Sequence, residues 1–175
     1  MRTIPALVVL LVSAGQVAAQ QQPDGSANRA AISRLSFMLG RWRGEAWMDR
    51  GGRRVQTTMT ETVEPKLEGT VLEIHGRGAM QTPQGERVVH EALGVLYFDA
   101  AAGAYVLRSW IGAGHTGEFT VAVQDSAVTW SRGVPGGQVR NTARFNGGVW
   151  HEIGEFSADG TAWQQVMEIR LRREE

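Results

Sequence analysis

Residues 37–49 read FMLGRWRGEAWMD, and the pattern of apolar side chains changes at Gly40. From Gly40 onward every second residue is small or apolar, a period of two that is typical of a β-strand. The residues predicted to share one face of this strand are Trp42, Gly44, Ala46 and Met48. Gly40 permits a sharp turn into the strand, because glycine adopts positive φ values freely. The sequence therefore predicts that a β-fold begins here.

The segment before Gly40 predicts one short helix, over 26–39. Ser26 or Asn28 is the expected N-cap, since both side chains can accept a hydrogen bond from the first turn. Gly40 ends the helix. The apolar residues that recur at helical spacing are Ala31, Leu35 and Met38.

Turn-forming segments rich in Gly, Asp and Asn divide the rest of the chain into ten predicted strands. These segments are 50–52, 66–69, 82–85, 99–103, 112–114, 124–126, 133–137, 146–148 and 157–160. Short strands joined by hairpins predict an all-β meander. A sheet of this size splits into a sandwich or closes, and closure removes exposed edges. We predict a closed antiparallel up-and-down β-barrel with the helix covering one mouth or flank; a sandwich is the alternative.

The composition limits the classes of function. The 175 residues carry 18 basic and 18 acidic side chains, so the chain lacks the basic excess typical of nucleic-acid-binding or acidic-membrane-binding proteins. The absence of cysteine excludes thiol catalysis, cysteine-ligated zinc and iron–sulfur clusters. The length suits a single domain, which we place at 28–175.

The first residues predict export. Residues 1–19 combine Arg2, a short apolar run over 4–12 and the small residues Ala18 and Ala19, as in a secretory signal peptide cleaved before Gln20. The run is too short for a comfortable membrane span, so no stable membrane insertion is expected after cleavage. Residues 20–27 are polar and are predicted to form a disordered leader. Because all but one of the basic residues are Arg, we expect a bacterial protein of the periplasm or exterior.

Three segments resemble a family of secreted bacterial lipocalin-like proteins with a conserved domain of unknown function. They are FMLGRWRG at 37–44, GVLYFDAAAGAYVLRSW at 94–110 and GEFSADGTAWQQVMEIRLR at 154–172. The resemblance covers roughly 35–173. It implies a barrel related in shape to lipocalins, fatty-acid-binding proteins and nitrobindins, with the Trp42 indole closing one end. It implies no particular activity.

Ionisable residues in the middle of predicted strands are the first candidates for a binding site. Buried charges must be paired, so we expect an interior cluster of carboxylates around Arg108, which points inward to meet Glu91, Glu152 or Glu168. Such a cluster would clamp a carboxylate or phosphate of a ligand. The alternative places these side chains on a solvated outer wall. The predicted ligand-binding residues are Arg108, Trp110, Glu91, Arg144, Glu152 and Glu168.

Two pairs of neighbouring residues, His90-Glu91 and His151-Glu152, support a second hypothesis. One member of each pair would face the cavity and act as acid or base in an enzyme. No His-x-His or other metal-ligand spacing occurs, so no metal site is predicted. Nitrobindins hold haem through a histidine on the last strand, whereas 161–173 contains none; a haem-binding barrel through His151 is a further alternative.

The sequence thus favours an exported binding protein that holds a small, mainly apolar ligand with an acidic head group. No cofactor and no nucleic-acid partner is predicted. A periplasmic enzyme, a haem protein and a filled barrel that acts through its surface are the alternatives. In the last strand, alternation places one apolar set on a common face, without deciding which face lines the cavity. That set is Trp163, Gln165, Met167, Ile169 and Leu171.

Overall fold

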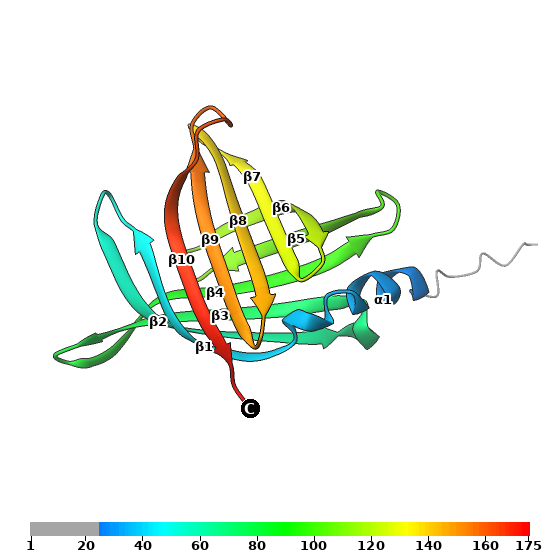
Figure 1. The fold of residues 1–175 in the computed structure, drawn as a ribbon, viewed down its shortest axis with the longest axis horizontal. Coiled ribbons are helices and arrows are strands. Elements are labelled where there is room, and N and C mark those ends of the chain that lie inside the picture. Colours follow the sequence, from blue (N-terminus) through cyan, green and yellow to red (C-terminus); the bar gives the residue numbers. More distant parts are fainter. Residues whose placement is uncertain (1–24) are drawn as a thin grey trace, which may run out of the picture.

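The computed structural model describes residues 25–175, which form a closed barrel of ten antiparallel strands (Figure 1). Each strand pairs with its neighbours in sequence, and β1 pairs with β10 to close the barrel. The strands are β1 (Gly40–Asp49), β2 (Arg54–Lys66), β3 (Val71–Thr82), β4 (Gly85–Asp99), β5 (Ala104–Ile111), β6 (His115–Gln124), β7 (Ala127–Val134), β8 (Gly137–Asn146), β9 (Val149–Ser157) and β10 (Gln164–Arg173). The predicted barrel and its nine turns are confirmed, and the sandwich alternative is wrong.

The predicted signal peptide at 1–19 and most of the predicted leader lie outside the described residues. Within the described part, no helix is both long and apolar enough to cross a membrane.

The N-terminal helix is shorter than predicted and is capped differently. Helix α1 spans Ser26–Ser33, and a separate 3-10 turn, η1, spans Ser36–Met38. The N-cap is Gly25, which has a φ of 67° and no side chain to donate or accept, so the predicted side-chain cap is wrong. The Asn28 amide instead donates to the Phe98 carbonyl oxygen at 2.6 Å. Asn28 therefore links the helix to β4 by a hydrogen bond instead of capping the helix N-terminus.

Helix α1 and η1 cover the barrel end at which β1 begins. Helix α1 packs against β3 and β4, and the Tyr105 hydroxyl donates to the Ala31 carbonyl oxygen at 2.8 Å. The Trp42 indole is 1% exposed and donates to the Met38 carbonyl oxygen at 2.9 Å. Its ring lies edge-on to Phe145 and Trp150, at centroid distances of 5.6 and 5.7 Å. This end is therefore closed by packed aromatic side chains, as the sequence predicts for Trp42.

The predicted shared face of the last strand is wrong before Met167, because β10 contains a bulge. Met167, like the buried Ile169 and Leu171, faces the interior. The register shifts between Gln165 and Met167, which leaves Gln165 opposite Glu155 on the outer wall. One extra residue reverses which side each preceding side chain faces. Gln165 and Trp163 therefore do not share the face of Met167, and Trp163 stacks instead under the outer-wall Arg140, 4.0 Å from the ring centroid.

Candidate functional site

The barrel interior holds a cavity of about 300 Å³ between the closed end and the β1–β2 and β5–β6 hairpins. Exposed Arg50 and Ile111 line it at these hairpins and mark its mouth. Most lining residues are apolar, and they include Met38, Ala46, Met48, Val55, Met59, Ile74, Val89, Ala92, Leu96, Leu107, Trp130, Trp150, Met167 and Ile169. The polar lining residues are Arg50, Thr57, Glu61, His90, Ser109, Asn141 and Glu152. An apolar wall with a few polar groups is typical of small-molecule sites.

Glu61 projects from β2 into this cavity and is only 8% exposed. Its strand partner is Gly76, and a Cβ atom at that position would lie 2.6 Å from the Glu61 Oε1 atom. The missing side chain at Gly76 therefore makes the room that the carboxyl group occupies. Among residues 25–175, no group forms a hydrogen bond or ion pair with the Glu61 carboxyl. The pKa of Glu61 is raised to about 8, mainly by burial and secondly by the nearby charge of Glu152.

Glu152 projects into the cavity from β9 and is 4% exposed. The Trp150 indole Nε1 donates to its Oε2 atom at 3.1 Å. Burial raises the pKa of Glu152 to about 7, and this hydrogen bond opposes the shift. Both pKa values are raised far enough that the two carboxyl groups retain protons near neutral pH.

His90 lies nearer the mouth, on β4. The pKa of His90 is lowered, mainly by burial and secondly by the positive charge of Arg50. The imidazole is therefore neutral at pH 7. Arg50 itself is exposed, and its guanidinium lies 3.5 Å from the Val89 carbonyl oxygen. The cationic group of Arg50 thus belongs to the rim of the cavity.

The inward orientation predicted for Arg108 is wrong. Its guanidinium is on the outer wall, where its Nε atom lies 2.6 Å from the Glu118 carboxylate and both side chains are more than half exposed. In β5 the buried Tyr105 and Leu107 face inward, so Arg108, which alternates with them, faces outward. Trp110 follows the same alternation and is 43% exposed on the outside. The expected arginine clamp for an acidic head group is therefore not part of the cavity.

The other predicted ligand-binding residues divide between the two walls. Glu91 is exposed outside, 3.4 Å from the His75 imidazole. Arg144 is exposed on the outer side of β8. Glu168 lies on the outer side of β10, and Glu152 alone of the six predicted residues lines the cavity.

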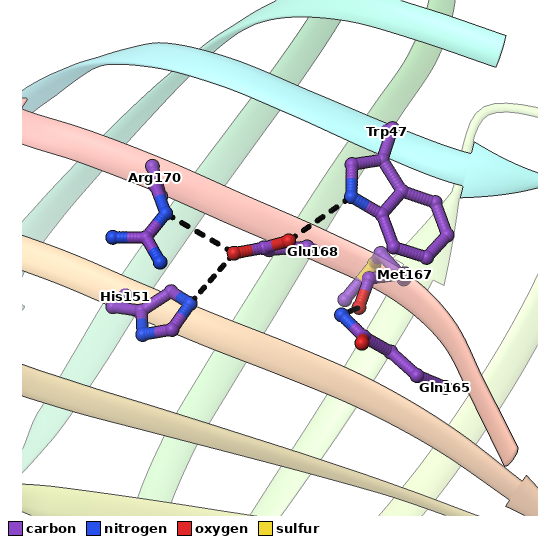
Figure 2. Close-up of polar contacts among 6 residues, drawn as sticks. All are labelled: Trp47, His151, Gln165, Met167, Glu168 and Arg170. Carbon is purple, nitrogen blue, oxygen red and sulfur yellow. Dashed lines mark hydrogen bonds and ion pairs between the residues drawn. The ribbon is translucent and has the colours of Figure 1, made fainter. Parts of the chain in front are cut away.

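Glu168 is the centre of a polar network on the outer wall (Figure 2). Its Oε2 atom accepts a hydrogen bond from the Trp47 indole at 3.1 Å, and its Oε1 atom lies 2.9 Å from the His151 Nε2 atom and 3.1 Å from the Arg170 Nε atom. These hydrogen bonds, with that from Trp47 the largest, lower the pKa of Glu168. The network joins β1, β9 and β10, and of its four residues Trp47 alone is also among those that line the cavity.

Glu61 is not among the six ligand-binding residues that the sequence predicts. Two features of the sequence mark it. Met59 and Val63 are its apolar neighbours on the same face of the strand, and glycines at 76 and 78 interrupt the next strand. A glycine inside a strand often marks close approach of another group. The pairing that sets Glu61 against Gly76 becomes visible only in the closed sheet.

The residues present do not fit haem. His151 is engaged with Glu168 outside the barrel, which removes the histidine on which this alternative depended. Among the described residues His90 is the only histidine that lines the cavity, and it lies beside Arg50 near the mouth. Two carboxyl groups occupy the wall deeper inside. No group of three or more potential metal ligands occurs within residues 25–175.

Comparisons with known proteins support the barrel fold. The crystal structure of Rv2717c from M. tuberculosis is similar to this chain, with a TM-score of 0.59 and 14% sequence identity. The similarity covers 85% of this chain and 98% of that one. No protein-family model and no curated protein matches the sequence. At 14% identity the likeness shows the fold alone, and membership of the secreted lipocalin-like family stays a prediction.

Proposed function

We propose that this protein is an exported binding protein that holds a small, mainly apolar ligand inside the barrel. The observation that carries the proposal is the cavity of about 300 Å³, whose apolar wall is interrupted by a few polar groups. That volume lies at the small end of the range for ligand sites, about 300–1,000 Å³. Export is supported by the signal-peptide pattern at 1–19.

The direct test is native mass spectrometry of the full chain expressed with export to the periplasm. We expect a bound small molecule that dissociates on denaturation, and a mature N-terminus at Gln20. In a variant with Ala92→Phe, the added ring would fill part of the cavity and displace the molecule. The matched control is Leu93→Phe, since the neighbouring Leu93 is 38% exposed on the outer wall. Equal occupancy in both variants would contradict the proposal.

Catalysis is the second candidate, and Glu61 and Glu152 support it. At neutral pH their pKa values of about 8 and 7 provide an acid and a base in one cavity. Of the four residues predicted for an enzyme, His90 and Glu152 line the cavity, whereas Glu91 and His151 lie outside. Within residues 25–175, the wall hydroxyls of Thr57 and Ser109 form no hydrogen bond with either carboxyl group. No activated nucleophile therefore accompanies the acid and base, and we place binding first.

A further inference from the structure

Two buried carboxyl groups face the cavity without a cationic partner. The charged and titratable residues that line it are Glu61, Glu152, His90 and Arg50. Neither carboxyl group has an ion pair within the described part of the chain, and the Trp150 indole is the one hydrogen-bond donor to Glu152 there. Arg50 and His90 lie together at the hairpin end.

Burying an unpaired carboxylate costs several kcal/mol, and proteins normally pair it or keep it protonated. Glu61 and Glu152 are close enough for the charge of one to raise the pKa of the other. Two such groups form a pair of acids for which the described residues supply no ion-pair partner. The strand glycine at 76 leaves the Glu61 carboxyl the space to lie at this centre.

We propose that the cavity binds a lipophilic primary amine, with its ammonium group held by Glu61 and Glu152 and its hydrocarbon part against the apolar wall. The inference rests on the proposed binding function and adds the chemical class of the ligand. An ammonium group carries three N–H donors and one positive charge, which is what two carboxylates with a single indole donor lack.

Other head groups match the centre less well. A carboxylate ligand would add a negative charge beside two buried acids, and like charges disfavour one another at short range. An alcohol can form hydrogen bonds with the carboxyl groups but leaves their ionisation uncompensated. The order of affinity should therefore be amine, then alcohol, then acid.

Isothermal titration of the full chain at pH 7 with octylamine, octanol and octanoate tests this order, since the three probes share one hydrocarbon chain. We expect octylamine to bind about tenfold or more tightly than octanol, and octanoate to bind most weakly. A bound ammonium lowers the pKa of both carboxyl groups, so octylamine binding should release protons. Repeating the titration in buffers of different ionisation enthalpy measures that release, and octanol should cause none.

The matched variants are Glu61→Gln with Glu152→Gln, which keeps the shape of the wall and removes both charges, and Glu118→Gln on the outer wall. The double variant should bind octylamine no more tightly than octanol, while the outer variant keeps the preference. If octanol binds and wild-type octylamine binds no more tightly, or without proton release, the inference is overturned and the binding function stands. Persistence of the preference in a folded double variant would also overturn it. If none of the three probes binds, both proposals fail.

Discussion

The carboxylates of the outer and inner walls of the barrel have different surroundings. Outside, Glu118 lies 2.6 Å from Arg108, Glu155 lies 2.7 Å from Arg140, and Glu86 lies 2.7 Å from Arg77. Inside, Glu61 and Glu152 have no such partner within residues 25–175. The same residue type is therefore paired where water already solvates it and unpaired where desolvation is severe.

The inner carboxyl groups therefore do not stabilise the folded state. Exposed ion pairs contribute about 0–1 kcal/mol each, so the outer pairs have little effect on the free energy of folding. A buried acid without a partner makes the folded state less stable, and an apolar side chain of similar size would pack at the same position at lower cost. Residues that lower stability inside a cavity are typical of sites kept for function.

Replacing an inner carboxyl by an apolar side chain should have the largest effect. We expect Glu61→Met to raise the free energy of unfolding at pH 8 by on the order of 3 kcal/mol. At that pH the unfolded chain ionises Glu61 freely, whereas the folded chain must either keep the carboxyl group protonated or bury it as an unpaired carboxylate. Urea unfolding followed by tryptophan fluorescence measures the change. Glu118→Met is the outer control and should lower stability by at most about 1 kcal/mol. A destabilised Glu61→Met protein would mean that the carboxyl has a stabilising partner.

The pH dependence of stability should be the next largest effect. The folded pKa values of Glu61 and Glu152, about 8 and 7, lie above their ordinary value of 4.5, so the folded chain holds protons that the unfolded chain has released. The free energy of unfolding therefore falls as the pH rises from about 4.5 to about 8. The lowered pKa of His90 opposes this trend only below about 6.5, its ordinary value.

Between pH 6.5 and 8 we expect the free energy of unfolding to fall by roughly 2 kcal/mol. The same urea titration at the two pH values measures it. The variant with Glu61→Gln and Glu152→Gln should show a nearly flat profile over this range. A wild-type profile that is flat, or that rises, would show that the inner carboxyl groups are ionised like the outer ones.

Breaking an outer pair should have the smallest effect. We expect Arg108→Ala to leave the midpoint of urea unfolding almost unchanged, since Arg108 and Glu118 are both more than half exposed. Octylamine and octanol should bind this variant as they bind wild type. A large decrease in that midpoint, or a loss of ligand affinity, would restore Arg108 to the interior role that the sequence predicts.

The fold could be predicted from the sequence because its determinants are local. Each hairpin coincides with a turn-forming segment, such as Arg50 to Gly52 or Asn146 to Gly148. Trp42 follows the glycine turn into β1 and is buried at the closed end, as the lipocalin-like resemblance implies. These features depend on neighbours in sequence, and the closed sheet leaves them unchanged.

The site could be predicted only in part, because it depends on which face of each strand turns inward. The outer face of β5 carries Val106 and Trp110 beside Arg108, so both of its faces contain apolar residues and the alternation is ambiguous. In β10 a bulge reverses the alternation before Met167. Glu61 depends on Gly76, a partner fifteen positions away that only strand pairing identifies. Glu152 was predicted because it is an ionisable residue in mid-strand, but the inward Arg108 expected to pair with it lies on the outer wall.

Within residues 25–175, Glu61 and Glu152 are acids without a charged partner, and burial raises their pKa values enough to keep protons on them near neutral pH. Titration of the glutamate side-chain carboxyl carbons by ¹³C NMR tests this claim most directly, with Glu61→Gln and Glu152→Gln used singly to assign the two resonances. We expect these two resonances to titrate near pH 8 and pH 7, whereas Glu168 on the outer wall should titrate below its ordinary range. If both inner carboxyl carbons instead titrate below about pH 5, like ordinary glutamates, the claim is contradicted.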